Sequence, residues 1–221
     1  TGSFVPPVPG TFYTSLSGII RHSSNGCTGE NGRGYEINPF DSTHYNVGFA
    51  PPFISQVDRD PPVPTSNQSP DITCNITDFD GTLDSVAICW SATAGQQPSQ
   101  FPAFNMTLIG GSTDEFEYTI PNQPNGTLVR YYIYAKDNDG NESYFPSKPV
   151  NQAEPNVSFY TVREGGLKIF DIQFSLDPNG ASPLEGETVT VTGIVTASAK
   201  QFDLGYLYIQ DEGGSEWSGI W

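Results

Sequence analysis

Two short acidic segments hold the residues whose types and spacing best suit a chemical role. They are DFDGTLD, residues 78–84, and DNDGNE, residues 137–142. If both segments join strands at the same end of a β-sandwich, their oxygens meet there and suit Ca²⁺, which takes about six to eight oxygen ligands. Tight turns require the same residue types, and neither segment has the full pattern of a helix-flanked calcium loop. The candidate calcium ligands are Asp78, Asp80, Asp137 and Asp139.

Residues suited to catalysis are few. His22 and His44 are the two histidines, and the sequence has no His-x-His or Cys-x-x-Cys spacing, no Gly-x-Ser-x-Gly motif and no phosphate-binding glycine loop. Asp211, Glu212 and Glu216 form an acidic group, but such groups in turns are usually solvated. We therefore expect no catalytic residues and no enzymatic activity.

Six of the 14 asparagines stand in Asn-x-Ser/Thr sequences, the acceptor motif for N-linked glycans. The motif is permissive, and a polar β-surface produces it without any sugar. In an acidic chain with few cysteines, it favours an extracellular or cell-surface glycoprotein. The candidate acceptors are Asn67, Asn75, Asn105, Asn125, Asn141 and Asn156.

Three cysteines leave at least one thiol unpaired within a single chain. Cys74 and Cys89 flank one turn, but strand parity places Cys74 on the face of Ile72 and places Cys89 opposite Ile88. We expect these two cysteines not to bridge. Cys27 is then a partner for Cys89 or for another molecule.

Aromatic residues near the C-terminal end offer rings for stacking or for an interface, and the candidates are Tyr206, Tyr208 and Trp217. OB folds stack bases on such rings. The net charge of -16, from 25 acidic and nine basic residues, disfavours nucleic acid as a partner because the phosphates would be repelled. Stacking on sugars stays open, as does packing within the protein.

The composition predicts an all-β fold. Gly and Pro number 23 and 19, Met occurs once, and no stretch repeats apolar residues at helical spacing over three turns. Short alternating runs between turn residues are typical of sandwiches and barrels. The 221 residues suit two domains of about 100 residues each. No apolar run approaches the roughly 20 residues of a membrane span.

The middle of the chain has the clearest pattern. LVRYYIYAKD alternates, with Val129 and Ile133 on an expected core face and with Tyr132 and Lys136 on an expected solvent face. The extended motif LVRYYIYAKDNDGNES, preceded by CNITDFDGTLDSVAICW, resembles the immunoglobulin-like or fibronectin-III-like modules of bacterial extracellular proteins. The resemblance implies a β-sandwich over residues 50–155.

The two flanks are similar to each other. YTSLSGIIRHS aligns with TVTVTGIVTAS so that Gly18 matches Gly193 and Ile19 matches Ile194, and a Gly-Tyr strand follows each. A glycine in the middle of a long strand permits a sharp bend, which lets one strand join both sheets of a small barrel.

The segment from LKIFDIQF to SEWSGIW, residues 167–221, resembles the OB-fold module found beside secreted bacterial nucleases and in cell-surface proteins. In that family the nuclease chemistry belongs to a separate domain. The resemblance implies a lead-in at DIQ and three opening strands within residues 156–221. It also implies the closing strands of such a barrel within residues 1–49.

A divided barrel allows three arrangements: the two ends close one barrel together, each end pairs with a neighbouring copy, or the chain is part of a tandem array. Free strand edges favour pairing, and head-to-tail pairing between copies produces a homopolymer. We therefore expect a structural subunit of a filament or surface layer. The alternative is an accessory module of a secreted enzyme that binds carbohydrate or single-stranded nucleic acid.

Overall fold

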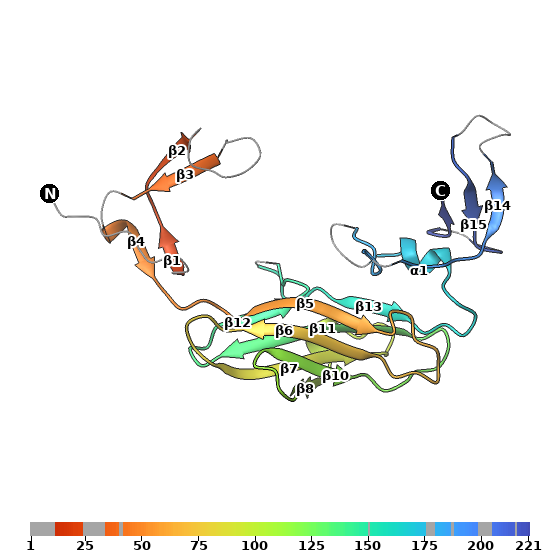
Figure 1. Ribbon diagram of the computed structural model, residues 1–221, viewed down its shortest axis with the longest axis horizontal. Coiled ribbons are helices and arrows are strands. Elements are labelled where there is room, and N and C mark those ends of the chain that lie inside the picture. Colours follow the sequence, from red (N-terminus) through yellow and green to blue (C-terminus); the bar gives the residue numbers. More distant parts are fainter. Residues whose placement is uncertain are drawn as a thin grey trace.

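The structure, a computed structural model, describes residues 12–23, 34–39, 42–149, 151–175, 180–186, 188–198, 205–214 and 216–221. Within these residues the chain is nearly all β (Figure 1). The exceptions are two short 3-10 helices and the α-helix α1 (Ile169–Gln173). The predicted all-β class is confirmed.

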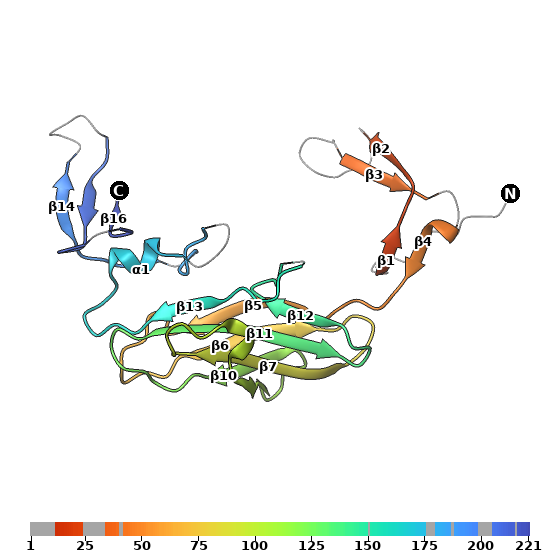
Figure 2. The same ribbon diagram turned by 180° about the vertical axis from the view of Figure 1, so that it is seen from behind.

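A β-sandwich occupies the middle of the chain, and Figure 2 shows it from behind. The strand order is β5-β6-β10-β9 in one sheet and β12-β11-β7-β8 in the other, with antiparallel pairing throughout. The first sheet contains β5 (Phe53–Asp60), β6 (Asp71–Thr77), β9 (Thr107–Leu108) and β10 (Glu115–Thr119). The second contains β7 (Leu83–Ser91), β8 (Ala103–Asn105), β11 (Leu128–Asp137) and β12 (Glu142–Phe145).

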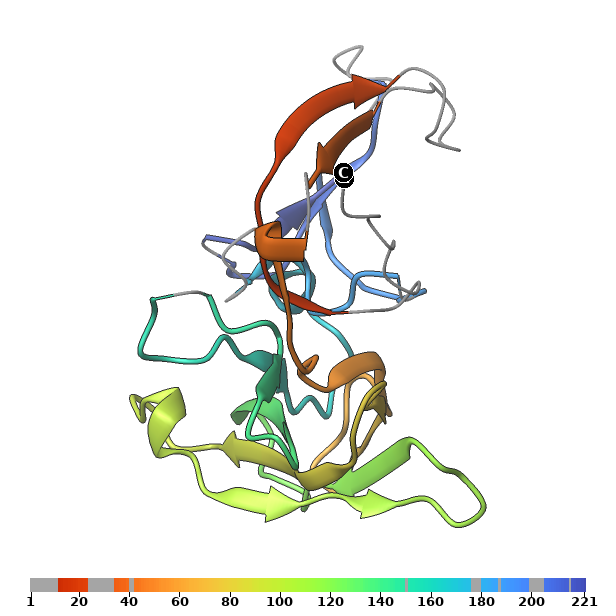
Figure 3. The same cartoon turned by 90° about the vertical axis from the view of Figure 1, so that its left-hand side faces the viewer.

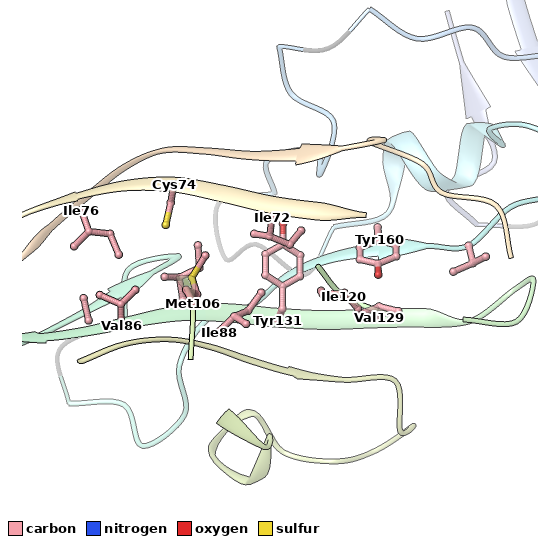
Figure 4. Close-up of a cluster of buried hydrophobic side chains, with 13 residues drawn as sticks. Ile72, Cys74, Ile76, Val86, Ile88, Met106, Ile120, Val129, Tyr131 and Tyr160 are labelled. Carbon is pink, nitrogen blue, oxygen red and sulfur yellow. The ribbon is translucent and has the colours of Figure 1, made fainter. Parts of the chain in front are cut away.

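The sandwich encloses one apolar core between its sheets (Figure 4). Ile72 and Ile76 of β6 face Ile88 of β7 and Val129 of β11. Ile133 of β11 belongs to the same cluster, and all five residues are almost completely buried. These positions follow the two-residue period of each strand, since alternate side chains point to the same face of a sheet. The core face predicted for β11 is therefore confirmed.

The opposite face of β11 is only partly solvated. Tyr132, which the alternation placed on the solvent face, is buried in a second small cluster with Cys89 and Phe101. Tyr132 is buried because of a tertiary contact. Phe101, which lies outside the strands, stacks on the Tyr132 ring with 6.2 Å between the ring centroids. Lys136 on the same face keeps partial exposure.

Cys74 and Cys89 are both free thiols. Cys74 lies in the core between the sheets, whereas Cys89 lies in the outer cluster. Burial raises the pKa of the Cys74 thiol to about 12, so this thiol is unreactive at neutral pH. The prediction that these two residues do not bridge is confirmed. Cys27 lies outside the described residues.

The sandwich continues beyond the boundary that the sequence suggested at residue 155. Strand β13 (Ser158–Thr161) pairs antiparallel with the first half of β11. Tyr160 and Val162 are buried in the main core. These contacts attach residues 158–162 to the sandwich.

The N-terminal strands form two small two-stranded sheets. Strand β1 (Tyr13–Leu16) pairs with β4 (Tyr45–Val47), and β2 (Ile19–Ser23) pairs with β3 (Gly34–Asn38). The chain leaves one sheet and enters the other at Ser17 and Gly18, where no strand is formed. The bend predicted at this glycine is present.

The C-terminal sheet has the order β14-β15-β16. It contains β14 (Ile194–Ala197), β15 (Tyr208–Gln210) and β16 (Gly219–Ile220). Gly193 lies directly before β14, and a side chain there would meet the Gln210 carbonyl oxygen at 2.9 Å and Ile169 Cδ1 at 3.1 Å. Glycine is therefore required by this close approach. The DIQ stretch, residues 171–173, forms the end of helix α1.

The two ends of the chain do not pair with each other among the described residues. Figures 1 and 2 place β1–β4 and β14–β16 at opposite ends of the long axis of the sandwich. The view from the side shows both groups beyond the same face of the sandwich (Figure 3). This arrangement does not support closure of one barrel by the two ends of the same chain.

We expect Ile133→Ala to lower the free energy of unfolding by about 2–5 kcal/mol, because it leaves a cavity in the centre of the core. Leu108→Ala is the matched control, since Leu108 is exposed on the short strand β9 and its removal should cost less than about 1 kcal/mol. Urea unfolding followed by circular dichroism measures both. Equal losses in the two variants would contradict the assignment of the core.

Candidate functional site

The most distinctive surfaces of the protein are its end strands, which expose apolar side chains on both faces. In β2, Ile19 and Ile20 are successive residues and are 52% and 67% exposed. In β14, the successive residues Ile194 and Val195 are 53% and 55% exposed. Neighbouring residues in a strand point to opposite faces, so neither face of either strand is covered. Consecutive apolar residues are typical of strands that are buried on both sides.

The same strands also have free backbone edges. Among the described residues β14 pairs only with β15, and β2 pairs only with β3. A free edge presents a row of N–H and C=O groups that can pair with another strand. The exposed apolar residues and the free edges therefore coincide in the same strands.

The edge strands β9 and β5 of the first sheet of the sandwich are protected, unlike the end strands. Strand β9 has two residues, which leaves little edge for a partner. Strand β5 carries charged residues and an irregular register between Ser55 and Asp58, where Gln56 has a φ of 48°. Short strands, charges and bulges are the usual means by which proteins block edge pairing. Strand pairing with another molecule is thus favoured at the two ends.

The three aromatic candidates have different surroundings. Tyr206 and Trp217 are exposed, and Trp217 has a φ of 61°, which is unusual for a bulky residue. Tyr208 is half-buried, and its ring centroid lies 6.3 Å from that of Trp221. Tyr206 and Trp217 are therefore the rings available to a ligand or to another protein surface.

An ion pair connects the C-terminal segment to the sandwich. Arg163 follows β13 and donates Nε and Nη2 to the two carboxylate oxygens of Asp171 at 2.8 and 2.6 Å. Asp211 accepts hydrogen bonds from the backbone N–H groups of Ile169 and Phe170 at 3.0 and 2.9 Å. Asp211 was predicted to lie in a solvated acidic turn with Glu212 and Glu216, but it binds the start of α1.

Arg163 and Asp171 were not among the candidate residues predicted from the sequence. They stand eight residues apart in a segment without regular periodicity, and no motif marks such a pair. Their association depends on where β13 ends and α1 begins, which only the folded chain shows. The apolar pairs of β2 and β14 were visible in the sequence, but their exposure was not.

The two acidic loops meet at one end of the sandwich, as the sequence predicted. Asn138 joins them, because its Oδ1 accepts the backbone N–H of Thr82 at 2.7 Å and its own N–H donates to the Thr82 carbonyl at 2.9 Å. A side chain at Gly81 would lie 2.5 Å from Asn138 Oδ1 and 2.8 Å from Asp78 Oδ2. The contact between the loops therefore depends on the absence of a side chain at Gly81.

The four candidate calcium ligands are engaged to different degrees. Asp80 Oδ2 accepts the Ala50 N–H at 2.9 Å, and Asp78 Oδ1 accepts the Gly81 N–H at 3.0 Å. Asp78 Oδ2 is buried without a hydrogen-bond partner, and Asp139 Oδ2 contacts Asn138 Nδ2 at 3.4 Å. No group of three His, Cys, Asp or Glu residues in the described part of the chain is arranged to hold a metal ion. Calcium binding stays a prediction, which a Ca²⁺-dependent thermal shift would test.

Asp137 is buried and stabilises its own loop. Oδ1 accepts the N–H groups of Asp139 and Asn141 at 2.9 and 2.8 Å, and Oδ2 accepts Asn141 Nδ2 at 2.8 Å. Burial acts to raise the pKa of Asp137, but hydrogen bonds from Asn141, Asp139 and Gly140 outweigh it, so the pKa lies below its ordinary value. This carboxylate is thus committed to the turn.

The six glycosylation candidates differ in the hydrogen bonds of their side chains and in their exposure. Asn141 Nδ2 donates to Asp137 Oδ2, and Asn156 Nδ2 donates to the Ser147 carbonyl, each at 2.8 Å. A glycan on either residue would have to break this bond, because the sugar attaches to the same nitrogen. Attachment stays a prediction, which intact mass of the natural protein would test. Asn67, Asn105 and Asn125 are exposed, and Asn75, Asn141 and Asn156 are partly buried.

No protein-family model matches this chain, and no curated protein matches it. Within the described residues, no helix combines the length and apolar character that crossing a membrane requires.

We expect Asp137→Ala to lower the thermal midpoint at pH 7, because the Asp139 and Asn141 amides lose their acceptor. A carboxylate with a lowered pKa stabilises the folded state at pH values above its ordinary pKa of 3.8. This stabilisation declines as the pH falls through the lower pKa of the native state. The difference between wild type and variant should therefore shrink below pH 3.8. Thermal unfolding from pH 2 to 7 measures it, and a constant difference would contradict the role of the charge. Asp84→Ala, at an exposed site, is the control.

Proposed function

We propose that this protein is a non-catalytic structural subunit that associates with copies of itself, head to tail, through strand complementation at its ends. The observation that carries the proposal is the exposure of apolar residues on both faces of β2 and β14, which also have free edges within the part of the chain that the structure describes. Such strands are stabilised when another strand covers them. The product of repeated pairing is a filament or a surface layer.

The energetics require both the apolar contacts and the backbone pairing. Full burial of an isoleucine or valine contributes about 1.5–3 kcal/mol, so each half-exposed side chain offers about 1 kcal/mol. The four such residues in β2 and β14 then offer about 4 kcal/mol, near the lower limit of the roughly 4–15 kcal/mol that association costs. Hydrogen bonds along a shared edge, at about 0.5–1.5 kcal/mol each, supply the remainder.

The geometry of the contact determines the type of assembly. The N-terminal and C-terminal strands are different surfaces at opposite ends of the long axis (Figure 1). A contact between two different surfaces leaves one of each free on every dimer. Repetition of such a contact gives a ring if it closes and a filament if it does not.

An extracellular or cell-surface location fits this role. Three exposed glycosylation motifs, a net charge of -16 and buried free thiols suit a protein that must stay soluble outside the cell before it assembles. Calcium at the acidic loops would add rigidity at the junction between the sandwich and the N-terminal strands. The loops contact that junction through the hydrogen bond from Ala50 to Asp80.

A second candidate function is an accessory ligand-binding module. Exposed Tyr206 and the unusual backbone of Trp217 favour it, because exposed rings held in fixed positions can stack on sugars. Single-stranded nucleic acid is a weaker candidate because of the acidic charge.

Self-association is tested with the full chain. We expect concentration-dependent light scattering and filaments in electron micrographs, and we expect Val195→Lys to abolish both because it places a charge in the buried contact. Leu108→Lys makes the same change at an exposed residue of the sandwich and should leave assembly intact. A compact wild-type monomer at high concentration would refute the proposal.

Ligand binding is tested on immobilised carbohydrate and single-stranded DNA. If the module binds sugar, the chain is retained on the carbohydrate column and Trp217→Ala or Tyr206→Ala removes this retention. Phe79→Ala is the control, since Phe79 is an exposed ring at the sandwich. If both Trp217→Ala and Tyr206→Ala are still retained on the column, these two rings are not part of the binding site.

A further inference from the structure

The strands β2 and β14 match each other in sequence and in environment. Each follows a glycine, Gly18 or Gly193, and each begins with two apolar residues that are more than half exposed. The two strands have five and four residues, so their edges have similar lengths. A partner strand for either one must therefore be short and must be apolar on both faces.

The C-terminal sheet has one suitable edge. At its other side, β16 has two residues and lies against α1. The segment before β14 is also covered, because Leu167 forms a parallel bridge with Val191. The edge open to a new strand is thus the four residues from Ile194 to Ala197, within the described part of the chain.

The N-terminal hairpin needs such a partner. Strands β2 and β3 pair only with each other among the described residues, and an isolated two-stranded hairpin is marginal in water. Ile37 of β3 is cross-strand from Ile20 and is also exposed. Docking onto the three-stranded C-terminal sheet would give the hairpin the additional strands that independent stability requires.

The net charges of the two terminal segments differ, and this difference affects which ends of two copies can come into contact. Residues 1–49 contain three acidic and two basic residues, whereas residues 167–221 contain eight acidic and two basic residues. Two C-terminal ends therefore repel each other, and a nearly neutral N-terminal end is the better partner for an acidic C-terminal end. The charge difference therefore disfavours contact between two C-terminal ends and leaves contact between an N-terminal and a C-terminal end open.

From these observations we infer that the free edge of β14 receives the β2–β3 hairpin of a second copy. This inference rests on the proposed self-association and specifies its two surfaces and its polarity. The sandwich takes no part in the contact.

Disulfide trapping in the full chain tests the inference. In a Cys27→Ser background, Ile20→Cys is mixed with an isotope-labelled chain that carries either Ile194→Cys or Val195→Cys. Residues that face each other across paired strands have Cα atoms about 4.5–5.5 Å apart, which a disulfide can span. Cys74 and Cys89 are buried and should not react.

We expect a mixed dimer between the labelled and unlabelled chains, at several times the yield of either homodimer. We expect one of the two C-terminal positions to be strongly preferred, because successive side chains point to opposite faces. Leu108→Cys in place of the C-terminal cysteine is the control and should give no mixed dimer.

The outcomes separate the inference from the proposed function. Assembly in light scattering without mixed dimers, or with homodimers in excess, would overturn the inference and leave self-association standing. Absence of any assembly by the wild-type chain would overturn both. Equal trapping at Ile194 and Val195 would also overturn the inference, because successive side chains of a paired strand point to opposite faces.

Discussion

The hydrogen-bonding requirement of the backbone is the constraint on which this structure depends. Every strand offers N–H and C=O groups along both edges, and a fold is complete when these groups are paired or protected. The sandwich meets the requirement with short outer strands, a bulge in β5 and a core between its sheets. Among the described residues, β2 and β14 each pair along one edge only, and this difference sets the two end surfaces apart from the sandwich.

The sandwich serves as a spacer that determines where the two end surfaces lie. Its core holds the two sheets together, since β6 of one sheet and β7, β11 and β13 of the other contribute its buried strand residues. On the C-terminal side, the ion pair of Arg163 with Asp171 and the contact of Asp211 with α1 attach the terminal sheet to this unit. Removing one partner of a largely buried ion pair leaves an uncompensated charge, so substitution of either residue would weaken this attachment.

The acidic loops show how turn chemistry and ligand chemistry use the same residues. Asp137 gives its oxygens to amides of its own turn, while Asp78 keeps one buried oxygen without a partner. The low native pKa of Asp137 follows from the amides that surround it. The loops therefore have a structural role that does not depend on any bound ion.

The sequence by itself determined the all-β class, the core face of β11, the bend at Gly18 and the separation of Cys74 from Cys89. These features follow from the two-residue period of strands and from local backbone geometry. The tertiary structure alone decided that β13 joins β11, that Phe101 covers Tyr132 and that the two ends lie apart. It also decided which of the apolar residues remain exposed. Such features depend on contacts between distant segments, which a local pattern does not contain.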